Sequence, residues 1–111
     1  MEGLVKGDVV VLLFPFSDLS SSRKRPAVVV AKLSGDDLIL AQITSSAVRS
    51  DEYAIHLEAE HFKQGQLSIP SLIRSNKLFT ADKSIILNKI GSLREDKVTE
   101  VQDLVVQIMT R

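Results

Sequence analysis

Short runs of apolar and β-branched residues, separated by residues that favour turns, dominate the first half of the 111-residue chain. Three such runs are VVVLLF at 9–14, PAVVVAKL at 26–33 and LILAQIT at 38–44. Continuous apolar runs of this length are typical of buried strands, and β-branched side chains fit a pleated surface. A Gly-Asp turn precedes the first run, and SGDD at 34–37 favours a hairpin before the third. We therefore predict three consecutive strands.

Weaker strand patterns continue through the second half of the chain. They are YAIHL at 53–57, LSIPSLIRS at 67–75 and KSIILNKI at 83–90. In YAIHL the larger residues Tyr53, Ile55 and Leu57 are two apart, which places them on one face of a strand. Between the first two patterns, EAEHFKQG at 58–65 predicts one or two helical turns that end at Gly65.

The C-terminal segment changes to a helical period. Its apolar residues recur at spacings of three, four and three: Val98, Val101, Val105 and Ile108. This stripe predicts an amphipathic helix from about residue 94 to 109, and Ser92 with Glu95 matches an S-x-x-E capping box at its start. Hairpin strands and one packing helix predict a single domain, residues 1–111, that is mainly β with α. We expect a small antiparallel barrel with a short internal helix and a C-terminal amphipathic helix.

Composition excludes several classes of protein. The 14 basic and 14 acidic residues cancel, so the chain is not expected to coat long nucleic acid by bulk charge. Without cysteine there is no disulfide framework and no Cys-ligated metal. Histidines and carboxylates do not cluster, so we expect no metal site and no cofactor. The start lacks a signal peptide and no apolar run approaches about 18 residues, so we expect a cytoplasmic protein without membrane spans.

Positive charge is concentrated locally instead. Residues 1–35 hold five basic and three acidic residues, or plus two. Within them SSSRKRP at 20–26 begins with serines, which favour turns, and Pro26 is expected at the first position of a strand or on an edge. Arg23, Lys24 and Arg25 are therefore predicted where a loop meets the sheet. Such a position suits a cation that binds phosphate.

The ordered set of motifs resembles the MazF/PemK-type toxins of bacterial toxin–antitoxin systems. KGDVVVLLFPFSD…RKRPAVVVAK is similar to the family's opening, where an Arg-Pro pair starts the second strand. AQITSS resembles its third strand, and LIRSNKLFTADKSIILNKIGSL its later block. The resemblance implies an SH3-like barrel and a homodimer. It also implies metal-independent cleavage of single-stranded RNA within short sequences, and neutralisation by a cognate antitoxin.

Such cleavage uses the 2′-hydroxyl of RNA as nucleophile, giving a 2′,3′-cyclic phosphate and a 5′-hydroxyl, and needs fixed positive charge and hydrogen-bond donors. The family motif places a catalytic arginine at Arg25, whose planar guanidinium suits phosphate. Thr44 matches the family's hydroxyl at the end of the third strand. Without the family resemblance, Arg25 would be interpreted as a surface cation and Thr44 as a residue that ends a strand.

Other residues are candidates for support of catalysis or for RNA binding: Arg23, Lys24, Ser20, Ser21, Ser22, Arg74, Asn76 and Asp18. In the branch of the family typified by Kid, an Arg-x-Asp pair performs acid/base work. Here Asn76 takes the place of the aspartate and cannot accept a proton at neutral pH. Asp18 is a candidate for the substitute base, and His56 and His61 are interpreted as surface or structural residues. Base specificity is expected from residues 15–24 and 45–52.

Two other functions remain open on sequence. One is a gyrase poison of the CcdB type, which the resemblance ties to a Trp-containing tail; this chain has no Trp and ends in Met-Thr-Arg. The other is a non-enzymatic module that only binds an antitoxin, which Asn76 keeps open because a fold does not fix a function.

Overall fold

The computed structural model describes residues 3–15, 22–45 and 51–111. It contains seven strands: β1 (Asp8–Pro15), β2 (Ser22–Lys32), β3 (Asp37–Thr44), β4 (Ala54–Leu57), β5 (Phe62–Gly65), β6 (Ser71–Asp82) and β7 (Ile86–Leu93). Two 3-10 turns, η1 (Ala59–His61) and η2 (Lys83–Ile85), precede β5 and β7, and helix α1 (Glu95–Met109) ends the chain.

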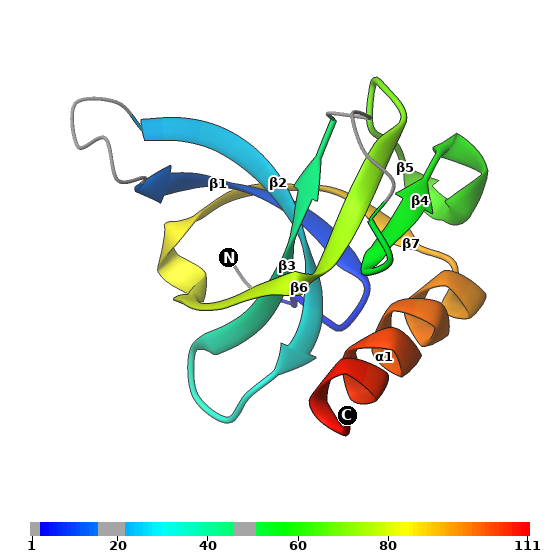
Figure 1. Cartoon of the computed structure of the whole chain (residues 1–111). Helices are drawn as coiled ribbons and strands as arrows, with labels where there is room; N and C mark the ends of the chain where they lie inside the picture. The colour runs from blue at the N-terminus through cyan, green and yellow to red at the C-terminus, as the bar shows by residue number, and fades with distance from the viewer. Residues whose placement is uncertain (1–2, 16–21, 46–50) are drawn as a thin grey trace.

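The strands form one antiparallel sheet in the order β4-β6-β3-β2-β1-β7-β5. The two edge strands, β4 and β5, are separated in sequence only by residues 58–61. Because so short a connection cannot span a flat sheet of this width, the sheet curls and brings its edges towards each other (Figure 1). This half-barrel with one terminal helix confirms the predicted fold class.

Both faces of the curled sheet carry a hydrophobic cluster. The first contains Val10, Leu12, Val29 and Leu40 among its buried members. The second contains Val9, Val28, Ile43 and Ile73, and α1 packs on it through Val101, which is 3% exposed. Because strand side chains alternate between faces, neighbouring valines of one strand serve both clusters. This explains why the first strands are continuous apolar runs.

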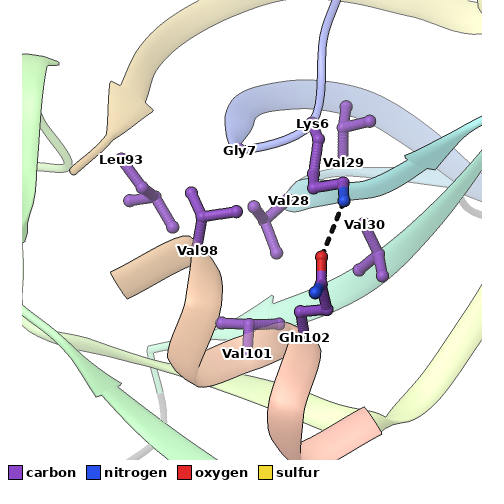
Figure 2. Close-up of a pocket in the computed structure, with 9 residues that line it drawn as sticks. All are labelled: Lys6, Gly7, Val28, Val29, Val30, Leu93, Val98, Val101 and Gln102. Carbon is purple, nitrogen blue, oxygen red and sulfur yellow. Dashed lines mark hydrogen bonds between the residues drawn. The ribbon is translucent and has the colours of Figure 1, made fainter. Parts of the chain in front are cut away.

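Helix α1 docks closely on the sheet. Figure 2 shows Val98 and Val101 of α1 against Val28 and Leu93, beside a hydrogen bond that Lys6 Nζ donates to Gln102 Oε1 at 2.6 Å. The space left between these side chains is about 10 Å³, room for one water at most. The helix is thus a packing element, as its apolar stripe predicts.

Several local predictions are wrong. Ser92 does not cap α1, because it is buried in β7 and its hydroxyl donates to Asp8 Oδ1 at 2.9 Å; Arg94 takes the N-cap position. The helical turn predicted at 58–65 ends at His61, since the next residues pair with β7 as β5. Residues 83–85 form η2 rather than the start of a strand.

Candidate functional site

The two residues predicted to be catalytic, Arg25 and Thr44, line one open groove with a volume of about 360 Å³. The lining comes from the beginning of β2, the end of β3 and the segment before β6: Lys24, Arg25, Pro26, Ile43, Thr44, Ser45, Leu67, Ser68, Ile69 and Ser71. Two cations, several hydroxyls and apolar side chains therefore share one concave surface.

Strand pairing explains why Arg25 and Thr44 meet. In the antiparallel pair of β2 and β3, Ala27 is opposite Gln42. The ladder begins at this pair. Arg25 lies two residues before Ala27 and Thr44 two residues after Gln42, so continuing the same register beyond the ladder would set them across from each other. Residues two apart on a strand share a face, and so do direct cross-strand neighbours. The fold thus brings both predicted residues to one place on the same face.

Arg25 is held by the sheet rather than by a loop. Its backbone pairs with Leu12, which is 1% exposed and belongs to the first cluster. The Arg25 side chain is half-buried, whereas Lys24 is exposed. A guanidinium anchored beside a core has few conformations to lose on binding an anion and keeps its charge. The position therefore suits a cation that stabilises negative charge on a bound anion.

The predicted basic loop is mostly strand. Ser22 and Arg23 pair with Pro15 and Phe14, because β1 continues far enough to meet them. Pro26 is consequently not the first residue of β2, although the pairing of β2 with β3 begins only after it, at Ala27. Three further predicted residues lie outside the described part of the chain: Asp18, Ser20 and Ser21.

Arg74 lies on β6, one strand beyond Thr44. Its backbone pairs with Gln42, while Thr44 pairs with Leu72. Arg74 Nη2 lies 2.9 Å from Asp51 Oδ2, and the two side chains are 30% and 20% exposed. Asn76 is exposed and further along the strand. The carboxylate beside Arg74 therefore comes from Asp51, which was expected only as part of the 45–52 range for base specificity and not as a partner of Arg74.

Asp51 is itself held in place. The backbone N–H of Tyr53 donates to Asp51 Oδ1 at 2.9 Å, and that of Ala54 donates to the Asp51 carbonyl at 3.0 Å. This is the turn that aspartate favours at the start of a strand. In the sequence, Asp51 before YAIHL indicates a turn. No local pattern indicates that the Asp51 carboxylate contacts Arg74 on β6.

The histidines do not line the groove. His56 is exposed on β4. His61 Nδ1 accepts a hydrogen bond from the backbone N–H of Glu58 at 2.9 Å and so closes the η1 turn. Both positions agree with surface or structural roles.

The sequence profile of a family described as "PemK-like, MazF-like toxin of type II toxin-antitoxin system" matches residues 5–109. This range contains nearly the whole chain and every residue of the groove. The chain belongs to this family.

Solved structures of family toxins share the fold. Mycobacterium tuberculosis toxin MazF-mt6 is 15% identical with a TM-score of 0.72, covering 93% of this chain and 96% of that one. A MazE-MazF structure from Deinococcus radiodurans is 17% identical with a TM-score of 0.77, covering 96% of each chain. An endoribonuclease in complex with its cognate antitoxin, from a mycobacterial species, is 11% identical with a TM-score of 0.70, covering 97% and 96%.

Among curated protein sequences, none matches this chain. Within the residues that the structure describes, no helix is long and apolar enough to cross a membrane.

Proposed function

We propose that the protein is an endoribonuclease toxin that cleaves single-stranded RNA within short sequences and without a metal ion. The groove that joins Arg25 to Thr44 is the observation that carries the proposal. Family membership supports the role of a toxin. Two structures with the same fold are described as endoribonucleases, one of them with its cognate antitoxin, and we extend that activity and that kind of partner to this chain.

In the proposed reaction the 2′-hydroxyl oxygen of RNA attacks the adjacent phosphorus, and the bond from phosphorus to the 5′ oxygen breaks. The hydroxyl loses its proton and the leaving 5′ oxygen gains one, so the products are a 2′,3′-cyclic phosphate and a 5′-hydroxyl. Negative charge grows on the phosphate oxygens in the transition state. Arg25 stabilises that charge through paired N–H donors, and the Thr44 hydroxyl donates to a phosphate oxygen or positions Arg25.

We further infer that residues 1–111 act as one toxin domain, in the cytoplasm, as a homodimer. Arg23, Lys24 and Arg74 are assigned to binding the RNA backbone, because they lie on β2 and β6, the strands on either side of β3, and cations attract phosphate.

The test is incubation of the purified protein with a mixed RNA, with and without EDTA, followed by analysis of the product ends. Cleavage that persists in EDTA and leaves cyclic phosphate with 5′-hydroxyl ends is expected. Dependence on added magnesium, or 5′-phosphate ends, would mean a different reaction.

A second candidate is a non-enzymatic module that only binds an antitoxin. Asn76 favours it, because the carboxylate of the Arg-x-Asp branch is absent at this exposed position. The absence of any cleavage, with retained binding of an antitoxin, would establish this second function.

A further inference from the structure

We propose that the segment between β5 and β6, residues 66–70, forms a rigid wall that reads a nucleobase next to the cleaved phosphate. This inference rests on the proposed function, and it adds a determinant of RNA sequence to the groove. From the sequence alone, base specificity is expected from residues 15–24 and 45–52. The wall segment belongs to neither of them. It leads directly into β6, where Leu72 pairs with Thr44, and so lies beside the end of β3 in the groove lining.

The wall segment presents two kinds of side chain to the groove. Leu67 packs against the second hydrophobic cluster and anchors the segment. Ile69 lines the groove and is 53% exposed, although it is a large apolar residue. Ser68 lies between them and is also exposed in the lining. An apolar platform next to a hydroxyl matches a nucleobase, which has an apolar face and a polar edge.

The backbone of the wall is fixed at both ends. At its beginning, Gly65 has a φ of +73°, and a Cβ there would lie 2.1 Å from the carbonyl oxygen of Ile90. At its end, the Ser71 hydroxyl donates to the Ile69 carbonyl at 3.1 Å. Pro70 restricts its own φ and keeps Ile69 out of helical conformations. A wall that is ordered before binding loses little entropy when a ligand arrives, so it can discriminate between ligands by shape.

Charge and size indicate the occupant. Lys24 and Arg25 form the β2 side of the groove and favour an anionic phosphate, whereas Ser68 and Ile69 form the side that the wall segment supplies. The volume of about 360 Å³ is at the low end for pockets that enclose small molecules, about 300–1,000 Å³. One nucleotide, with its phosphate on the cations and its base on the wall, uses both sides. An acidic peptide would use only the cations.

The test compares cleavage of short RNAs that differ only in the base at each position around the cut. Ser68→Ala and Ile69→Ala are compared with Val106→Ala, a control that removes a branched apolar side chain of matching exposure, 54% against 53%, outside the groove lining. Both wall variants should change the preference among bases at one position by about tenfold, the range that a few pocket contacts provide. The Val106→Ala protein should keep the wild-type preferences, and circular dichroism should show that all three variants are folded.

The outcomes separate this inference from the proposed function. If the wild-type protein cleaves no RNA, the proposed function and the wall both fail. If it cleaves and the wall variants keep its base preferences, or lose rate equally on all sequences, only the wall fails. If the variants instead lose affinity for an acidic antitoxin peptide with unchanged base preferences, the wall is a protein-docking surface and the inference is overturned.

Discussion

The guanidinium of Arg25 is carried by a strand that pairs with β1 at that residue, and its side chain is half-buried. We predict that Arg25→Ala lowers the rate of RNA cleavage by about a hundredfold or more, as the loss of a fixed transition-state donor does elsewhere. Lys32→Ala is the matched control, because it removes an exposed cation from the other end of β2. Rates on one short RNA and thermal unfolding of both variants provide the measurement. An Arg25→Ala protein that is folded and within a fewfold of the wild-type rate would remove Arg25 from the active site.

Some single residues act in ways that their local sequence does not reveal. Asp8 follows a turn glycine, and the sequence analysis reads it only as part of a turn. In the structure it is 1% exposed and accepts hydrogen bonds from Val5 N–H and from Ser92 Oγ, each at 2.9 Å. Lys89 Nζ lies 3.3 Å from its carboxylate. Ser92 and Lys89 are more than 80 residues away along the chain, so no local pattern contains this cluster.

At the scale of the element, the join between β5 and the wall segment depends on one glycine. Gly65 and Gly35 both have positive φ, at 73° and 83°, but only Gly65 is packed against backbone. We predict that Gly35→Ala costs about 1–2 kcal/mol of unfolding free energy, the strain of a left-handed residue. Gly65→Ala should cost about 4 kcal/mol or more, because a Cβ there overlaps the β7 backbone and the strand must move.

Urea denaturation of the two variants tests this difference, and the matched φ values make Gly35→Ala the control. Equal costs at the two glycines would mean that β5 shifts freely on β7. In that case the wall segment would not be rigid.

The elements predicted correctly are those whose side chains carry a repeating pattern. Val9, Val10, Val28 and Val29 are buried in the two clusters, and α1 packs on the second cluster through Val101, so burial selects residues that the pattern marks. Element ends were predicted less well, because tertiary partners decide them. Ser92 gives its hydroxyl to Asp8 instead of to the helix, and β2 begins at Ser22 because β1 reaches far enough to pair with it.

At the scale of the whole molecule, the side of the groove formed by β2 and β3 could be predicted from the sequence. Arg25 and Thr44 come from consecutive strands, so a hairpin register is enough to bring them together. The other side of the groove, formed by Leu67 to Ile69, comes from the segment between β5 and β6. Its position depends on the pairing of β6 with β3, in which Leu72 is opposite Thr44, and no local sequence signal describes that long-range pairing.

The exposed apolar surface leads to a prediction about assembly. Leu13, Ile85 and Leu87 are 41%, 44% and 43% exposed on β1, η2 and β7. Leu12 pairs with Ile86, so these side chains belong to neighbouring strands. Symmetric pairing is the usual way to cover such a surface. Sedimentation at micromolar concentration should therefore show a species of twice 12.2 kDa. A single monomer species would contradict the homodimer.

The last prediction concerns how an antitoxin would inhibit RNA cleavage by binding in the groove. Lys24 is exposed and Arg25 half-buried in its lining, so a disordered acidic segment can pair with both and fold on binding. Exposed ion pairs contribute about 0.2–1 kcal/mol each and are screened by salt, so high salt should weaken inhibition by about tenfold. Titration of the antitoxin into a cleavage assay at low and high salt, with uninhibited rates as the reference, measures this effect. A short RNA should also be displaced by the bound antitoxin; simultaneous binding of both would place the antitoxin on a different surface.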